Sequence, residues 1–101
     1  MTMHLRFETR VYRWQARQDT AWFFADVPEE LSAEVREVMQ PFARGFGAVR
    51  VAATVGATTW RTSIFPGSSG TYALPLKRAV REGEGLVEGG PVTVDLDILD
   101  G

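Results

Sequence analysis

The chain of 101 residues is long enough for one compact domain and too short for two, so residues 1–101 are expected to form a single domain. Its 45% hydrophobic and 11% aromatic residues are typical of a packed globule, and its formal net charge of −2 provides no overall field to attract nucleic acid or anionic membranes. The absence of cysteine excludes disulfides and thiolate chemistry, and one histidine, His4, near a terminus is too little for a metal site or a catalytic triad.

The sequence also predicts where the protein resides. The first residues, MTMHLRFETR, contain no apolar core of a secretory signal. The longest apolar run, Ala21 to Ala25, is far shorter than the roughly 20 residues of a membrane span. Ten arginines against one lysine and no asparagine are typical of a GC-rich bacterial genome. We therefore expect a bacterial, cytoplasmic protein that does not engage membranes.

Two strands are predicted before the first helix. The segment LRFETRVYRW, residues 5–14, alternates as a strand does, but its apolar face switches from Val11 to Tyr12, which predicts a β-bulge. The polar residues 15–20 predict a turn. The segment AWFFADV, residues 21–27, is apolar on both faces and predicts a strand that is buried on both sides.

A helix is predicted over residues 28–42, because five apolar residues recur there at helical spacing. These residues are Leu31, Val35, Val38, Met39 and Phe42. Pro28 suits the first helical position. Alternatively, residues 28–31 form a 3₁₀ turn and Ser32 caps the true helix. Pro41, followed by Gly45 and Gly47, is expected to end the helix.

The second half of the chain predicts four strands and a short helix. The strands are expected over residues 48–55, 58–65, 71–73 and 92–99. Gly56 takes the first central position of a two-residue hairpin turn, and PGSSG, residues 66–70, forms a loop. Pro75 opens a two-turn helix with Leu76, Ala79 and Val80 directed inward, and Gly83 or Gly85 ends it.

The order of these elements suggests an internal repeat. Each half contains a strand, a proline, a helix, a glycine exit and a further strand. We therefore predict a mainly β fold. It would be a small β-barrel of the double-split, pseudo-twofold type with about six strands, capped by one longer and one short helix.

The chain also resembles a known family. The pattern AWFFADVPEE, followed by WRTSIFPGSSGTYALPLKRAVREGEGLVEGGPVTVDLDI, resembles an uncharacterised bacterial family, domain-of-unknown-function family nineteen-oh-five. The resemblance extends from Phe7 to Ile98 and is most specific at Trp22 and at residues 60–66 and 72–81. It implies a small closed or half-closed barrel with one or two helices and no assigned chemistry. Some members are fused to a YdeI/OmpD-associated domain of the bacteriocin-protection type.

A second resemblance is confined to the C-terminal half. Its strand, Leu-Pro, short basic helix, acidic-glycine turn and strand are similar to the swapped-hairpin unit of AbrB and MazE-type proteins. Those proteins pair two such units from two chains and bind DNA. The resemblance implies, as an alternative function, a DNA-binding transcription regulator or antitoxin-like module.

Six residues make up the predicted ligand site. They are Trp60, Arg61, Ser63, Tyr72, Lys77 and Arg81. Lys77 and Arg81 share a helix face, and Lys77 lies near the helix N-terminus, where backbone N–H groups favour an anion. Arg61 projects from the neighbouring strand beside Ser63. This pattern predicts a phosphate or carboxylate site, and the alternative is a solvated basic face answered by the acidic residues of segment 82–88.

Three other features of the sequence are candidate sites. The many aromatic residues either stack on a ligand or fill the barrel interior, and Trp60 and Tyr72, which flank the PGSSG loop, are the best candidates for ligand contact. The segment PGSSGT lacks the spacing and the lysine of a phosphate-binding P-loop and predicts a turn. Asp95 and Asp97, on the outward face of the last strand, favour solubility and edge protection over acid–base work.

These observations favour a non-enzymatic module with no cofactor and no metal. We expect it to bind a small anionic ligand or a partner protein, as a monomer or a homodimer. Nucleic acid remains the alternative partner, because four arginines on the first strand extend the basic cluster. They are Arg6, Arg10, Arg13 and Arg17. A net charge of −2 argues against it, since phosphate neutralisation supplies most of the affinity for DNA.

Overall fold

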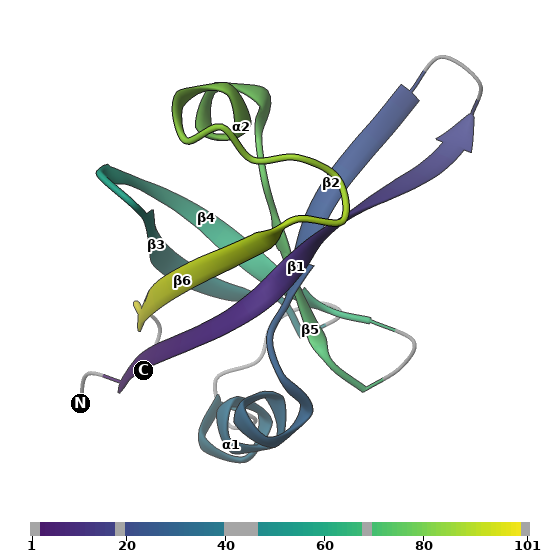
Figure 1. The fold of residues 1–101 in the computed structure, drawn as a ribbon. Coiled ribbons are helices and arrows are strands. Elements are labelled where there is room, and N and C mark those ends of the chain that lie inside the picture. The colour runs from purple at the N-terminus through teal and green to yellow at the C-terminus, as the bar shows by residue number, and fades with distance from the viewer. Residues whose placement is uncertain (1–2, 18–19, 40–46, 68–69, 100–101) are drawn as a thin grey trace.

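The computed structural model describes residues 3–17, 20–39, 47–67 and 70–99, in which six strands close into a barrel with two helices outside it (Figure 1). The elements are β1 (Met3–Arg17), β2 (Thr20–Asp26), α1 (Glu29–Met39), β3 (Val49–Val55), β4 (Thr58–Pro66), β5 (Tyr72–Pro75), α2 (Arg78–Gly83) and β6 (Pro91–Ile98). The order around the barrel is β1-β2-β5-β4-β3-β6, with every neighbouring pair antiparallel. The predicted mainly β barrel with one longer and one short helix is confirmed.

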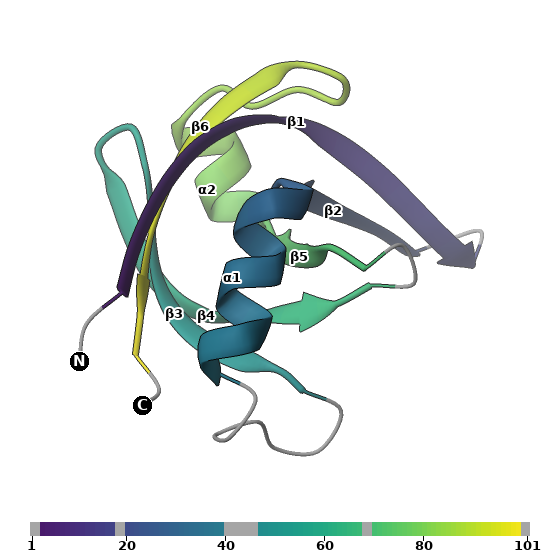
Figure 2. The ribbon, with the colours of Figure 1, turned by 90° about the horizontal axis from the view of Figure 1, so that it is seen from below.

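The order of the strands is consistent with the predicted pseudo-twofold symmetry. Exchanging β1, β2 and β3 with β4, β5 and β6 leaves the order around the ring unchanged. β2 pairs with β5, and each of these two strands is followed by a helix, α1 after β2 and α2 after β5. The two helices lie at opposite ends of the barrel, as the two views show (Figures 1 and 2).

The long first strand joins both parts of the barrel. Residues 3–10 pair with β6 and residues 11–17 pair with β2, so one strand serves two partners. The register is continuous from Val11 to Trp14, and the irregularity lies between Trp14 and Arg17. The bulge predicted at Val11 is therefore wrong, because Tyr12 simply faces outward in the regular alternation.

The β1–β2 hairpin also differs from its prediction. Strand pairing reaches Arg17 and resumes at Thr20, so the turn is shorter than residues 15–20, and residues 18–19 lie outside the described part. β2 is not buried on both sides. Ala25 is fully buried, but the side chain of Trp22 is 52% exposed, because this hairpin projects beyond the barrel (Figure 1).

The barrel interior holds one apolar core, and the strict alternation of β3 and β6 supplies much of it. Their buried residues are Val49, Val51, Ala53, Val55, Val92, Val94, Leu96 and Ile98. The predicted inward faces of these two strands are confirmed. Gly56, with φ of +58°, forms the predicted two-residue turn between β3 and β4, a conformation that favours glycine.

A buried serine fastens α1 to the barrel. The Ser32 hydroxyl donates to the Val27 carbonyl at 2.9 Å and accepts from the Tyr72 N–H at 3.0 Å. Ser32 also donates its N–H to the Pro28 carbonyl at 2.8 Å, and α1 begins at Glu29, directly after the proline. Ser32 therefore lies inside the helix, and the alternative in which it caps the helix is wrong.

The predicted helical stripe of α1 is mostly correct. Val35 and Met39 are buried and Leu31 packs against the core, but Val38 is exposed. Phe42 and the predicted helix end at Pro41 and Gly45 lie outside the described residues.

The second helix starts later than its proline suggests. Pro75 belongs to β5, where it pairs with Phe24, and α2 begins only at Arg78. Leu76 and Val80 are buried as predicted, whereas Ala79 is exposed. The helix ends at Gly83, one of the two predicted stops.

Replacing Ser32 tests the serine bridge between α1, β2 and β5. Ser32→Ala should lower the free energy of unfolding by about 1–3 kcal/mol, because it leaves the buried Tyr72 N–H without its acceptor. Urea denaturation measures this change. Ser63→Ala, at a partly exposed strand position, should stay within about 0.5 kcal/mol of wild type. Equal effects of the two substitutions would contradict the bridge.

His4 should make stability depend on pH. Its ring lies 2.7 Å from Asp97 and 3.2 Å from Asp95, and chiefly the hydrogen bond to Asp97 raises the pKa of His4 above its ordinary 6.5. The protonated ring therefore adds stability that is complete below pH 6.5 and is lost as the pH rises through the higher folded-state pKa. Urea unfolding between about pH 5.5 and 8.5 should show this decline in wild type but not in His4→Gln. A decline of the same size in both proteins would exclude His4 as its source.

Candidate functional site

A cleft of about 350 Å³ lies between β2, β4 and the start of α2. We call it the basic cleft. Its lining combines aromatic and apolar walls with four cations and, in the part of the chain that the structure describes, includes no acidic residue. The residues are Ala21, Trp22, Phe23, Trp60, Arg61, Thr62, Pro75, Leu76, Lys77, Arg78 and Arg81.

Arg81 is the most firmly held of the cations. Its guanidinium carbon lies 4.0 Å from the centroid of the Phe23 ring, and its Nε donates to the Leu76 carbonyl at 3.0 Å. The stacking contact is a cation–π interaction, which orients the planar guanidinium before any ligand arrives. Arg81 thus links α2 to β2 and places its charge in the cleft.

Arg61 and Lys77 bring charge to the same cleft from separate segments. Arg61 is exposed on β4, and Lys77 is the exposed residue directly before α2. Among the described residues, neither side chain has a hydrogen-bond or ion-pair partner. Their charges are therefore not neutralised by the part of the protein that surrounds them.

The start of α2 lies beside Lys77 at the basic cleft. The helix has only six residues, and the N–H groups of Val80 and Arg81 both donate to the Lys77 carbonyl. These bonds are the usual first bonds of a helix and do not engage the N–H groups of Arg78 and Ala79, so the expectation that helix N–H groups favour an anion beside Lys77 stays a prediction.

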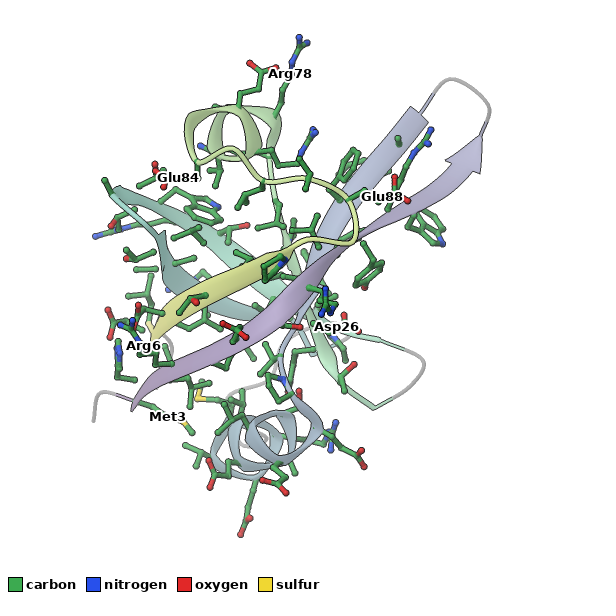
Figure 3. All side chains as sticks on the ribbon, viewed as in Figure 1. Met3, Arg6, Asp26, Arg78, Glu84 and Glu88 are labelled. Atoms are coloured by element: carbon green, nitrogen blue, oxygen red, sulfur yellow. The ribbon has the colours of Figure 1, made fainter. Side chains whose placement is uncertain are left out.

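Arg78 lies on a solvated face and is paired with an acidic residue, as the alternative interpretation of the basic cluster predicted. Its side chain points away from the barrel (Figure 3), and its Nε lies 2.6 Å from Glu82. This hydrogen bond raises the pKa of Arg78 and lowers the pKa of Glu82. An exposed pair of this kind adds little stability, and it removes much of the charge that Arg78 offers to the cleft.

The structure thus brings four of the six predicted site residues together. Trp60, Arg61, Lys77 and Arg81 line the basic cleft, although Trp60 is only 8% exposed and mainly fills the core. Ser63 and Tyr72 do not line it. Tyr72 is buried, with its N–H bonded to Ser32 and its ring 6.0 Å from the Arg36 guanidinium.

A second recess adjoins the first, and its lining does not include Trp60 or Tyr72, the two aromatic residues predicted as the best candidates for ligand contact. Its volume is also about 350 Å³, and it lies on the outer surface of β1, β2, β5 and β4. We call it the aromatic face. It is lined by Tyr12, Trp14, Trp22, Phe24, Phe65, Pro66, Gly67, Ala73 and Pro75.

The outward position of the residues in the aromatic face was not predicted, because their sequence pattern suggested other structures. Tyr12 and Trp14 suggested a bulge, and the apolar run of β2 suggested burial on both sides. In the structure Tyr12 pairs with Phe24 and Trp14 pairs with Trp22, all in one outward-facing set. The signal in the sequence was the regular spacing of two between aromatic residues on each strand.

The other predicted features have structural roles. Asp95 and Asp97 face His4 and Arg6 across β1 and β6, with Arg6 3.2 Å from Asp95. Part of the PGSSG loop, residues 68–69, lies outside the described residues. Among the described side chains, no three His, Asp or Glu residues gather as a metal site, and no helix has the length and apolarity to cross a membrane.

Comparison with known protein families identifies the family of this chain. The model of the domain of unknown function DUF1905 matches residues 7–96, nearly the whole barrel. The chain belongs to the DUF1905 family. No curated protein matches it. For this DUF1905 domain, the fusion partners and the swapped-hairpin likeness described above remain predictions.

The packing of Arg81 leads to a test on stability. Arg81→Ala should lower the free energy of unfolding by about 1–2 kcal/mol, because it removes the stack on Phe23 and the hydrogen bond to Leu76. Arg61→Ala removes the same charge from a side chain that has no described contact. It should change the free energy of unfolding by less than about 0.5 kcal/mol. Thermal denaturation at matched salt compares them, and equal melting temperatures would contradict the role assigned to Arg81.

Proposed function

We propose that this DUF1905 domain is a non-enzymatic binding module that holds a small anionic ligand in the basic cleft. One observation carries the proposal. Three cations from two segments, Arg61 on β4 and Lys77 and Arg81 around α2, line one cleft, and two of them lack a described partner. Cations that are brought together at an energetic cost, without acids to neutralise them, favour an anion between them.

The walls of the cleft support this proposal. Trp22, Phe23 and Leu76 exclude water from one side, so a charge in the cleft is screened less than on an open surface. Arg81 presents a planar fork that suits a phosphate or carboxylate, and its stack on Phe23 limits the entropy lost on binding. Lys77 adds a compact charge on a flexible stem.

The composition of the lining favours binding over catalysis. The described residues of the cleft are cations, aromatic and aliphatic side chains, and one hydroxyl, Thr62. They offer charge and shape, while a hydrolytic or transfer reaction would require a paired nucleophile and base. A swapped-hairpin DNA binder is less favoured, because here both helical units close one barrel within a single chain.

A calorimetric titration tests the anion site. Wild-type protein should bind at least one member of a panel of inorganic phosphate, citrate, sugar phosphates and nucleoside monophosphates. The double substitution Arg61→Ala with Lys77→Ala should weaken that binding about tenfold or more, because charge-assisted hydrogen bonds are lost.

The control removes the same charge elsewhere. Arg6→Ala with Arg10→Ala takes two arginines from β1, where Arg6 faces Asp95 and Arg10 donates to the Gly89 carbonyl. It should leave the affinity within about twofold of wild type. Equal affinities of the two double variants, or no heat with any anion, would refute the proposal.

A further inference from the structure

The aromatic face is an unusual surface for a small charged protein. Four of its rings are more than a third exposed: Tyr12 at 37%, Trp14 at 53%, Trp22 at 52% and Phe65 at 38%. Single exposed apolar residues are common, but a contiguous group on adjacent strands marks a site of interaction. The question is what occupies it.

The rings are held in place before any partner binds. Tyr12 and Phe24 stack with centroids 5.8 Å apart and planes at 29°. The Tyr12 hydroxyl donates to Asp26 at 2.8 Å, and burial, followed by this hydrogen bond, raises the pKa of Tyr12. Trp14 lies opposite Trp22 in the strand register. Rigid aromatic rings on a strand surface lose little entropy when a flat ring stacks on them.

The aromatic face is continuous with the basic cleft. Trp22 and Pro75 line both recesses, so rings at one end lead directly to Arg61, Lys77 and Arg81 at the other. A complementary partner would carry flat rings and regularly spaced negative charges in one flexible chain. That description fits single-stranded nucleic acid, whose bases stack on aromatic side chains while its phosphates follow a basic groove.

We propose that the domain binds a short single strand of RNA or DNA, with bases on the aromatic face and phosphates in the basic cleft. The proposal rests on the anion site of the proposed function and names its occupant. A duplex is a poorer partner, because its bases are stacked inside and cannot reach Trp14 or Phe65. The mode also differs from that of the swapped-hairpin proteins, since it uses the outer strand surface and reads no duplex groove.

Other occupants fit only part of this surface. A second copy of the chain that packs ring against ring would cover the aromatic face without using the cations of the basic cleft. A proline-rich peptide would use the rings alone. A mononucleotide would fill one of two recesses that each measure about 350 Å³.

The number of cations sets the expected salt dependence. Each phosphate neutralised on a single strand contributes about 0.7 to the slope of log Kd against log salt. Arg78 is paired with Glu82, so three cations remain, and the slope should be about 2. Binding should therefore be moderate in strength and only moderately sensitive to salt.

Tryptophan fluorescence gives a direct readout. Two of the three tryptophans, Trp14 and Trp22, lie on the aromatic face, so stacking of bases should quench the emission. Hexamers of uridylate and of thymidylate, labelled for anisotropy, serve as probes, and inorganic phosphate is titrated in parallel. The double substitution Trp14→Ala with Phe65→Ala should weaken hexamer binding about tenfold or more and leave phosphate binding unchanged.

Two further variants sharpen the test. The single substitution Trp14→Tyr keeps a stacking ring and should therefore retain most of the wild-type affinity for the hexamers. Val38→Ala, which trims an exposed apolar residue on α1, should have no effect. Arg61→Ala with Lys77→Ala should weaken both hexamer and phosphate binding.

The outcomes separate this proposal from the proposed function. Phosphate binding without hexamer binding overturns the nucleic-acid proposal and leaves the anion site standing. Hexamer binding that falls with the cations but not with Trp14 and Phe65 overturns it as well, because the aromatic face is then unused. A dimer in sedimentation that the Trp14 and Phe65 substitutions dissociate shows that a second copy occupies the face, and tighter binding of a proline-rich peptide than of the hexamers assigns it to a protein. If the wild-type protein binds neither phosphate nor the hexamers, both proposals are refuted.

Discussion

The pairing of β2 with β5 is the constraint on which the rest of the structure depends. Ala25 lies opposite Leu74, and beyond this pair the Val27 N–H reaches the Tyr72 carbonyl while the Leu76 N–H reaches the Phe23 carbonyl. The two hydrogen bonds run in opposite directions across the β2–β5 pair, which we call the seam, as a pseudo-twofold arrangement requires. Because the strands belong to different halves of the chain, this short ladder closes the barrel and fixes where both helices begin. Without it, the halves would still pair through β1–β6, β3–β4 and β3–β6, but the sheet would stay open between β2 and β5.

Both recesses are products of that seam. Leu76 leaves β5 beside Phe23, so the turn into α2 carries Arg81 over the Phe23 ring and creates one wall of the basic cleft. On the outer surface Pro75 lies opposite Phe24, and this contact continues the aromatic face from β2 to β5. The residues that hold the halves together therefore also place rings and cations side by side. A substitution that loosens the seam is expected to affect fold and binding together.

The sequence predicted elements better than surfaces. The alternation of β3 and β6 and the glycine turn at Gly56 were predicted correctly, because each depends on local chemistry. The starts of the helices were less certain, since a proline opens a helix or ends a strand equally well, and only the pairing of Pro75 with Phe24 decides. The convergence of Arg61 with Arg81 was predicted from a strand that neighbours the helix, but the outward position of the rings in the aromatic face was not. An aromatic residue such as Trp22 has the same signature in a core as on a binding surface, and only its place on a projecting hairpin separates the two.

The net charge of −2 argued against nucleic acid as a partner, but the structure shows that the charges are not evenly mixed. α1 carries Glu29, Glu30, Glu34 and Glu37 against the single Arg36, whereas α2 and the residue before it carry Lys77, Arg78 and Arg81 against Glu82. The two helices are counterparts in the pseudo-twofold barrel and lie at its opposite ends (Figures 1 and 2). The α1 end is thus acidic, whereas near α2 the cations line the basic cleft and Glu82, Glu84 and Glu88 lie outside its lining. A small anion or strand that approaches within a Debye length, about 8–10 Å, responds to the nearer end and not to the sum. Net charge consequently limits long-range attraction, while the local field at α2 determines whether an anion is held.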